Sequence, residues 1–144
     1  IFNLFNAGNC IVTGPKESKY VKKVARLWKA VGMNTVFMTP QQHDDAVAGI
    51  SHMPHLAAFA LLHSQKDCIK NSKDIIGTGF KSMTRIGASG EDVWAGILYA
   101  NKEQVIKQAQ RYRKEIERAE KMLKAGKVMP YIKAARLLRE SLDK

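Results

Sequence analysis

The 144-residue sequence has few of the features that mark membrane, secreted or metal-binding proteins. Its only cysteines are Cys10 and Cys68, too few for a disulfide framework or a thiolate metal site, which favours a reducing compartment, the cytoplasm. No run of about 18 apolar residues occurs, so a membrane-spanning helix is not expected. Hydrophobic residues nevertheless make up 45% of the chain, which excludes a disordered protein and predicts a folded core.

Acidic residues are scarce relative to basic ones, with 13 Asp and Glu against 24 Lys and Arg, which gives a formal charge of +11. The excess lies toward the C-terminal end, since residues 102–144 carry 13 cations and 6 acids. Acids are interspersed with bases there on strongly helical sequence, a pattern typical of a solvated helix face. A stripe that binds the nucleic-acid backbone is the alternative, and it is the less favoured of the two.

The first forty residues predict a strand-helix-strand unit. Short apolar runs at 10–13 and 35–38, each closed by glycine or proline, are typical of β-strands. Between them, apolar residues recur at helical spacing from Tyr20 to Val31. Two strands and one helix cannot bury both faces of a sheet. Residues 1–39 are therefore predicted to be the end of a larger α/β domain.

From Thr39 onward the pattern is helical, and residues 40–144 are predicted to form an all-α domain. Thr39 can cap a helix whose first turn holds Pro40 and which continues to Leu62. Pro54 lies inside that helix and removes one of its hydrogen bonds, so a kink is expected there. The predicted fold class is mainly α, with a small α/β portion in front.

Three further features complete the predicted helical part. A glycine-bearing loop is expected at 77–80, and the capping-box spacing of Ser89 and Asp92 predicts the start of another helix. The longest helix should run from Asn101 to about Gly126. Its apolar residues are spaced alternately by four and three positions and form a heptad seam, made of Val105, Ala109, Tyr112, Ile116, Ala119 and Leu123. Such a seam packs against another helix, either in the same chain or across a dimer interface.

The densest polar cluster is the segment Ser51-His52-Met53-Pro54-His55. On a helix, Ser51 and His52 both lie next to His55. Three interpretations are open. The histidines can bind a metal, for which a third ligand is missing nearby; they can be buried and hydrogen-bonded beside the proline; or their donors can face a ligand at the kink. Because of the missing ligand, no metal is predicted.

Arg85 is the second candidate site residue. It stands in a weakly charged stretch after the glycine-bearing segment, so a buried or half-buried guanidinium is expected. A buried guanidinium needs an anion as its partner, and the planar guanidinium can donate two parallel hydrogen bonds to a carboxylate. That anion is either a substrate or an internal acid in a salt bridge. Trp94, nine residues later, is by pattern alone more typical of a core residue than of a ligand platform.

Taken in order, several motifs resemble the C-terminal portion of the prephenate and arogenate dehydrogenase family of tyrosine biosynthesis. They are Leu4-Phe5, Thr39-Pro40-Gln41-Gln42-His43-Asp44, Ser51-His52-Met53-Pro54-His55, Gly79-Phe80-Lys81, Thr84-Arg85-Ile86, Trp94 and Asn101. The resemblance covers residues 4 to about 110, and the histidine-proline and threonine-arginine motifs are specific at this separation.

The resemblance implies an oxidative decarboxylation of prephenate to 4-hydroxyphenylpyruvate with NAD or NADP. A hydride leaves the carbon that bears the ring hydroxyl, and the ring carboxylate is lost. By the same resemblance, Arg85 binds the ring carboxylate, and His55, Ser51, Trp94 and His52 line the substrate site. The resemblance further implies that residues 1–39 are the C-terminal remnant of a Rossmann-type nucleotide-binding domain. The family's catalytic histidine and its glycine-rich dinucleotide loop would lie upstream of this sequence, which agrees with a first residue other than methionine. No catalytic residue is therefore assigned, the cofactor-binding residues are unknown, and the chain alone is expected to be inactive.

The resemblance also implies a cytoplasmic homodimer built through the helical domain, with a small-molecule substrate and no membrane association. One departure from the family pattern is Ser82, which stands where many members have an acid three residues before the arginine. This departure leaves the choice between prephenate and arogenate open. A non-catalytic helical module for dimerisation or regulation is the alternative function.

Overall fold

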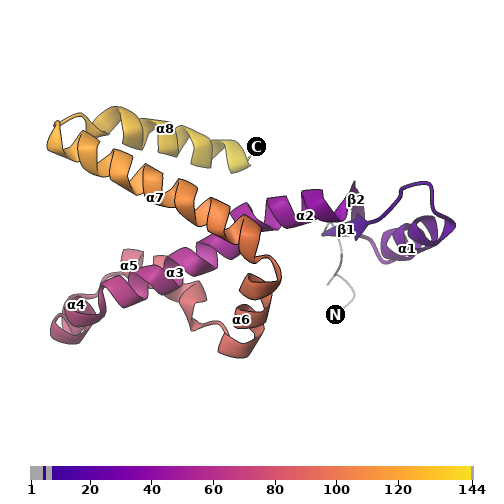
Figure 1. The fold of residues 1–144 in the computed structure, drawn as a ribbon, viewed down its shortest axis with the longest axis horizontal. Helices are drawn as coiled ribbons and strands as arrows, with labels where there is room; N and C mark the ends of the chain where they lie inside the picture. Colours follow the sequence, from indigo (N-terminus) through magenta and orange to yellow (C-terminus); the bar gives the residue numbers. More distant parts are fainter. Residues whose placement is uncertain (1–4, 6–7, 144) are drawn as a thin grey trace. The chain divides into compact units, whose positions relative to one another are not determined.

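The computed structural model describes residue 5 and residues 8–143, so Leu4, which contributes to the family resemblance, lies outside the described residues. The chain packs into two compact units, Ile1–Val105 and Ile106–Lys144. This division into compact units does not test the domain boundary predicted after residue 39, and that boundary stays a prediction. The described part is mainly helical with one small sheet, which confirms the predicted fold class (Figure 1).

The first unit opens with the predicted strand-helix-strand arrangement. Strands β1 (Asn9–Thr13) and β2 (Asn34–Met38) are parallel, with Val12 opposite Phe37 in the register. Helix α1 (Lys19–Ala30) connects them and begins at Ser18, whose hydroxyl accepts a hydrogen bond from the Tyr20 amide. Parallel strands need such a crossover, because a tight turn can join only antiparallel neighbours.

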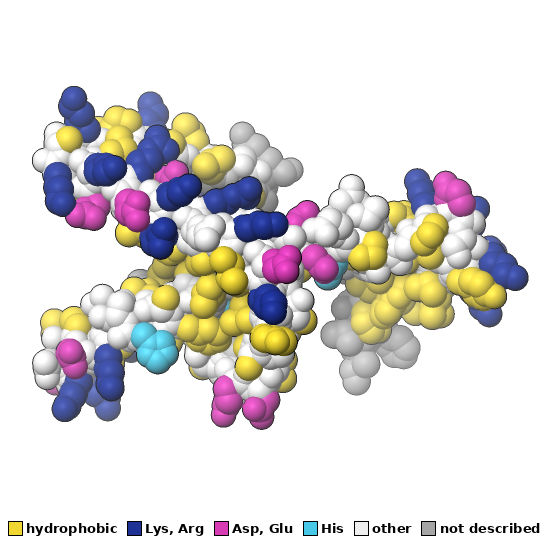
Figure 2. Space-filling model, in the orientation of Figure 1, with side chains coloured by type: hydrophobic (Ala, Val, Ile, Leu, Met, Phe, Trp, Pro, Cys, Tyr) yellow, Lys and Arg dark blue, Asp and Glu magenta, His cyan; other side chains and the backbone are white. Residues whose placement is uncertain are grey.

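This strand-helix-strand unit leaves much apolar surface uncovered. Val12 and Ala25 are buried, but apolar side chains on α1 such as Tyr20 and Leu27 are 70% and 63% exposed. Hydrophobic side chains gather over this part of the chain in Figure 2. One helix covers only part of one face of a two-stranded sheet, as expected for a remnant of a larger α/β domain.

Helix α2 (Pro40–Val47) begins as predicted. The Thr39 hydroxyl accepts from the Gln42 amide, and the Gln42 side-chain oxygen accepts from the Thr39 amide. This reciprocal pair is a capping box, and it satisfies backbone donors that the first turn of a helix leaves free. Pro40 costs nothing at this position, since its missing amide hydrogen would have no partner in the helix.

The predicted kink at Pro54 takes the form of a π-helical turn. This turn, η1 (Ala48–His52), joins α2 to helix α3 (Met53–Ser64), and the Met53 amide bonds to the Ala48 carbonyl five residues earlier. Proline cannot donate to the carbonyl four residues before it, so a widened turn just ahead of it accommodates the lost bond. Ser51 and His52 are the last two residues of this widened turn.

The remaining elements of the first unit are short. They are α4 (Lys66–Asn71), the 3-10 turn η2 (Lys73–Ile75), α5 (Thr78–Thr84), the 3-10 turn η3 (Arg85–Ala88) and α6 (Glu91–Ala100). The loop predicted at 77–80 is wrong beyond Gly77, because α5 starts at Thr78 and takes Gly79 into its first turn. Gly77 has a negative φ of −79°, so it holds no conformation reserved for glycine.

The capping box predicted from Ser89 and Asp92 is also wrong. Helix α6 starts at Glu91 after Gly90, and no side chain caps it. The Ser89 hydroxyl instead donates to the Ile86 carbonyl at 2.7 Å, closing the preceding turn η3. A serine hydroxyl bonds readily to a nearby backbone carbonyl, and here that local bond replaces the cap.

The second unit is a helical hairpin (Figure 1). Its helices are α7 (Lys102–Lys124), whose first residues belong to the first unit, and α8 (Val128–Glu140), followed by the 3-10 turn η4 (Ser141–Asp143). Gly126 turns the chain between them with a φ of +66°, as predicted for a helix stop. The Arg118 guanidinium lies over the Tyr131 ring at 5.8 Å and joins the two helices.

Charged side chains of the hairpin pair mostly within their own helix. Arg113 lies 3.6 Å from Glu117 and Arg139 lies 2.7 Å from Asp143, each pair four residues apart. Figure 2 shows lysines and arginines spread over the visible face of the hairpin with acids among them. Exposed pairs at this spacing are typical of a solvated helix surface. None of the described helices is both long and apolar enough to cross a membrane.

Candidate functional site

Three elements bring four of the predicted site residues together. Ser51 and His52 end the π-helical turn, His55 lies in the first turn of α3, and Trp94 faces them from α6. All four side chains are half-buried. The structure thus places four of the five predicted site residues in one cluster, which we call the histidine-tryptophan cluster.

His55 is held firmly within this cluster. Its ring stacks on the Trp94 ring with the centroids 3.4 Å apart and the planes 18° from parallel. Its Nδ1 lies 2.9 Å from the Ser51 carbonyl oxygen. Because a carbonyl only accepts hydrogen bonds, the hydrogen must be on Nδ1 of His55. In the neutral ring Nε2 is then left as an acceptor, and it has no hydrogen-bond partner among the described residues.

His52 also contacts Trp94. Its ring lies edge-on to Trp94, with the centroids 6.3 Å apart and an interplanar angle of 83°. Burial lowers the pKa of His52 below its usual value, and the nearby rings of His43 and His55 lower the pKa further. The Asp44 carboxylate opposes this shift. The neutral imidazole is therefore favoured, and it can act as both a donor and an acceptor.

Asn101 also belongs to the site, although the sequence did not identify it as a site residue. It was expected only as a helix cap and as part of the resemblance. Its side-chain nitrogen lies 2.8 Å from the Asp44 carbonyl oxygen and 3.4 Å from Nδ1 of His52. The partners are 57 and 49 residues away in the sequence. A pattern of spacing along the chain cannot predict a contact between residues so far apart in the sequence. The sequence pointed to Asn101 only through the family resemblance.

Arg85 differs from expectation in its burial. It begins η3 and is exposed in the single chain, so the predicted half-buried guanidinium is wrong for the chain by itself. It also makes no ion pair with any described residue, which removes the internal salt bridge as an explanation. Turn η3 packs on α3, where Gly87 meets Ala58 and Leu62. Arg85 therefore projects from an element fixed to the helix that carries His55.

A metal centre is not assembled from these histidines. Among the described residues, no group of three or more His, Cys, Asp and Glu side chains lies close enough to hold a metal ion. The third ligand that the sequence lacked nearby is thus not supplied by the fold within that part of the chain.

The described residues include no glycine-rich dinucleotide loop. A dinucleotide loop joins a strand to a helix of a parallel sheet and needs several glycines for close backbone approach to the phosphates. The strand-helix junction of this kind, between β1 and α1, holds one glycine, Gly14, followed by Pro15. We therefore assign no residue of this chain to a cofactor.

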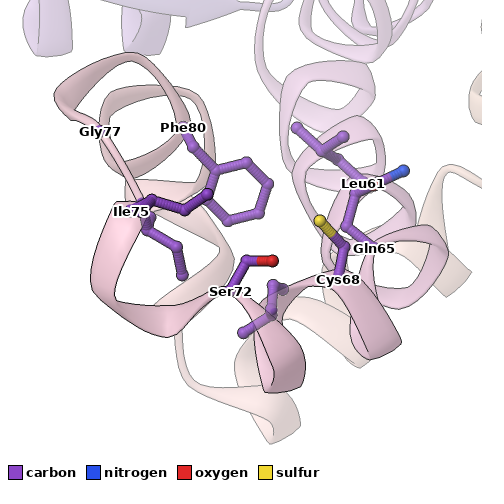
Figure 3. Close-up of a pocket in the computed structure, with 9 residues that line it drawn as sticks. Leu61, Gln65, Cys68, Ser72, Ile75, Gly77 and Phe80 are labelled. Atoms are coloured by element: carbon purple, nitrogen blue, oxygen red, sulfur yellow. The ribbon is translucent and has the colours of Figure 1, made fainter.

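The first unit contains an apolar cavity of about 370 Å³ separate from the histidine-tryptophan cluster (Figure 3). Phe80 of α5 faces Leu61 of α3 across it, and Cys68 lies on the same side as Leu61. It is lined by Leu61, Gln65, Cys68, Ile69, Ser72, Ile75, Ile76, Gly77 and Phe80. None of the described residues that line this space is charged, so it offers no counter-ion to a carboxylate substrate.

Comparison with known proteins shows the family of the chain. Residues 39–138 match the family described as "Prephenate dehydrogenase, dimerization domain". This chain belongs to the prephenate dehydrogenase family. The match includes the histidine-tryptophan cluster, Asn101 and Arg85. It begins at Thr39, the residue that caps α2.

Individual family members show the same relationship. The chain is 28% identical to the prephenate dehydrogenase of Bacillus subtilis over 95% of its own length, but this covers only 39% of that protein. It superposes on a prephenate dehydrogenase from Aquifex aeolicus, crystallised with hydroxyphenyl propionate and NAD+, with a TM-score of 0.85 and 28% identity. That comparison covers 97% of this chain and 52% of the other. A Synechocystis arogenate dehydrogenase, 23% identical, shares the fold with a TM-score of 0.76. The chain thus spans between 39% and 52% of the length of these relatives.

Proposed function

We propose that this chain supplies the substrate-binding and dimerising part of a prephenate dehydrogenase. The NAD or NADP site of that enzyme would lie mostly outside this chain. The proposal is supported chiefly by the unpaired guanidinium of Arg85 and its fixed position. This guanidinium has no counter-ion among the described residues, yet η3 fixes it to α3, the helix that carries His55. An arginine placed in this way is matched to an external carboxylate, which prephenate carries on its ring.

The histidine-tryptophan cluster supplies the other contacts of the proposed site. The Ser51 hydroxyl and the Nε2 atoms of His52 and His55 have no hydrogen-bond partners among the described residues, so they are available to polar groups of a substrate. The Trp94 ring holds His55 in place by stacking. In the Aquifex aeolicus enzyme the bound hydroxyphenyl propionate has a ring hydroxyl and a carboxylate. A substrate of that class needs a guanidinium and neutral donors, and this chain has both.

We also propose that the chain forms a homodimer through its helical hairpin, in keeping with the family's dimerisation domain. No residue from 106 to 143 is buried in the single chain. The large apolar side chains left between 44% and 79% exposed are Ile106, Tyr112, Ile116, Leu123, Met129, Ile132, Leu137, Leu138 and Leu142. Two helices cannot bury such a surface by themselves, and a second copy supplies an identical apolar face.

A fluorescence titration tests the substrate proposal. Trp28→Phe leaves Trp94 as the only tryptophan, so prephenate binding beside it should change the emission in a saturable way. Replacing Arg85 with alanine removes a charged contact worth about 2–5 kcal/mol, so we expect affinity to fall by about 30-fold or more. Arg26→Ala, an exposed arginine on α1, is the matched control.

Two results would contradict the proposal: prephenate leaves Trp94 emission unchanged, or Arg85→Ala binds as tightly as the parent protein. The same titration with arogenate decides which substrate the site prefers. A stable dimer that binds neither compound would favour the non-catalytic module. If the site is correctly assigned, this chain joined to a dinucleotide-binding domain should oxidise prephenate with NAD or NADP and lose that activity with Arg85→Ala.

A further inference from the structure

The Asn101 side chain reaches between two distant parts of the first unit. It lies at the end of α6, just before α7, and its amide nitrogen contacts both the Asp44 carbonyl on α2 and Nδ1 of His52 on η1. These two partners belong to consecutive elements, α2 and η1, of one helical segment. One amide group therefore ties the α6–α7 junction to the part of the helix that presents the first histidine.

The contact with Asp44 fixes which way the Asn101 amide points. The oxygen and nitrogen of an amide side chain are distinguished by their partners. The Asp44 backbone oxygen can only accept a hydrogen bond, so the atom 2.8 Å from it must be the NH2 nitrogen of Asn101. That same nitrogen lies 3.4 Å from His52, so an N–H group of Asn101 faces the His52 ring.

The orientation of the amide determines where His52 carries its hydrogen. A neutral imidazole has one nitrogen that donates and one that accepts. Because an N–H of Asn101 faces Nδ1, this nitrogen has to be the acceptor, and the ring hydrogen is left on Nε2. His55 has the opposite arrangement, since its Nδ1 donates to the Ser51 carbonyl. The two neighbouring histidines thus present one donor and one acceptor from the same type of side chain.

We propose that Asn101 is a positioning residue that holds the His52 ring in the form with its hydrogen on Nε2, so that His52 donates a hydrogen bond to a carboxylate or keto oxygen of the substrate. This inference rests on the proposed function for the nature of the substrate. The Nε2 atom has no partner among the described residues, Trp94 packs edge-on against the ring, and His52 is only half-buried.

The tautomer can be measured directly in the 144-residue chain. Long-range nitrogen-proton NMR of the chain labelled with 15N-histidine, recorded at about pH 8 where an ordinary imidazole is neutral, distinguishes the protonated ring nitrogen from the bare one. We expect His52 to show a bare Nδ1 and a protonated Nε2. Asn101→Asp replaces the donor by an acceptor and should move the hydrogen to Nδ1. Asn71→Asp makes the same change at the exposed end of α4 and should leave His52 unaltered.

Prephenate affinity supplies the second readout. Asn101→Asp should weaken binding by about tenfold, and this loss should vanish in a His52→Gln background, because Asn101 acts through that ring. A wild-type His52 with its hydrogen on Nδ1 would overturn the inference without any variant being needed. So would an Asn101→Asp protein with an unchanged tautomer, or a tenfold loss that persists without His52. If the tautomers are as expected but prephenate binds no variant, the positioning of His52 stands and the proposed function fails.

Discussion

At the scale of single residues, the protonation of His52 links the site to the stability of the fold. Its pKa is lowered by burial first and then by the neighbouring His43 ring. Asn101, which presents an N–H group to Nδ1, also disfavours the protonated ring, because an imidazolium would bring two donors face to face. The neutral state of this ring is therefore part of the native structure.

The lowered pKa predicts how stability depends on pH. Below about pH 6.5 the unfolded chain binds a proton at this histidine while the folded chain resists it, so unfolding is favoured. Stability should consequently fall as the pH drops through the interval between 6.5 and the lower folded pKa, and it should level off above that interval. Urea unfolding followed by circular dichroism between about pH 5.5 and 7.5, at one fixed protein concentration, measures this dependence.

Substitution of the histidine isolates its contribution. His52→Gln cannot take up the proton, so its unfolding midpoint should change less over this pH interval than that of the parent chain. His63→Gln, at the exposed end of α3, is the matched control and should keep the parent dependence. Identical pH profiles for the parent and His52→Gln would show that another group is responsible.

Residue-level prediction from the sequence succeeded where the signal is local and failed where it is not. The Ser51-His52-Met53-Pro54-His55 motif identifies its own cluster, because helical spacing alone brings these side chains together. The link from Asn101 to Asp44 and His52 depends on how α6 and α2 pack, and no spacing along the chain encodes that. The burial expected of Arg85 failed for a related reason, since exposure is set by what packs around a residue.

At the scale of elements, the close packing of η3 on α3 sets the position of Arg85. Gly87 lies so near α3 that an added Cβ would stand 2.6 Å from the Leu62 Cδ1 atom and 3.7 Å from the Ala58 Cβ. Glycine thus allows the approach of the two elements by having no side chain. The strong helical pattern on either side predicted the helices but not this contact, which joins residues from separate elements.

Two glycine substitutions should therefore have opposite effects. Gly87→Ala forces Leu62 or η3 to move, so we expect a loss of about 1–2 kcal/mol in the free energy of unfolding. It should also weaken prephenate binding, because η3 carries Arg85. Gly96→Ala, inside α6 with no atom within 4 Å of the added Cβ, should stabilise the chain by about 0.5–1 kcal/mol. Urea unfolding of both variants checks the signs, and a Gly87→Ala chain as stable as the parent would refute the packing argument.

The π-helical turn and the wrong loop prediction at 77–80 show the limits of local signals for elements. Pro54 predicted a kink in the helix, and a π-helical turn lies just before it, but the proline does not dictate whether the helix bends or widens into a π-turn. Gly77 and Gly79 predicted a loop because glycine favours turns, yet the helix that starts at Thr78 includes the second of them. Tertiary packing overrides a weak propensity of this size.

At the scale of the whole molecule, the chain by itself leaves too little apolar surface buried to account for a stable helical hairpin. Val105, the first residue of the heptad seam, is buried in the first unit, while Ile116 and Leu123 are 53% and 62% exposed. The sequence predicted the seam from its alternating spacing but left open whether its partner lies in the same chain. Within the described residues, α8 packs on α7 without burying these seam positions.

We expect the seam to be covered by a second copy, which a charge placed within it should expel. Burying a leucine or isoleucine side chain contributes about 1.5–3 kcal/mol, and a lysine in its place loses that contribution and brings an unpaired charge to the interface. The double variant Ile116→Lys, Leu123→Lys should therefore be monomeric, in sedimentation equilibrium, at concentrations where the parent chain is a dimer. Gln110→Lys adds a charge to an exposed face of α7 outside the seam and should leave the dimer intact. Because the apolar surface of the hairpin has no other cover among the described residues, the monomeric variant should also unfold at a lower urea concentration. A parent chain that sediments as a monomer throughout, or a double variant that dimerises as tightly as Gln110→Lys, would show that this surface is covered in some other way.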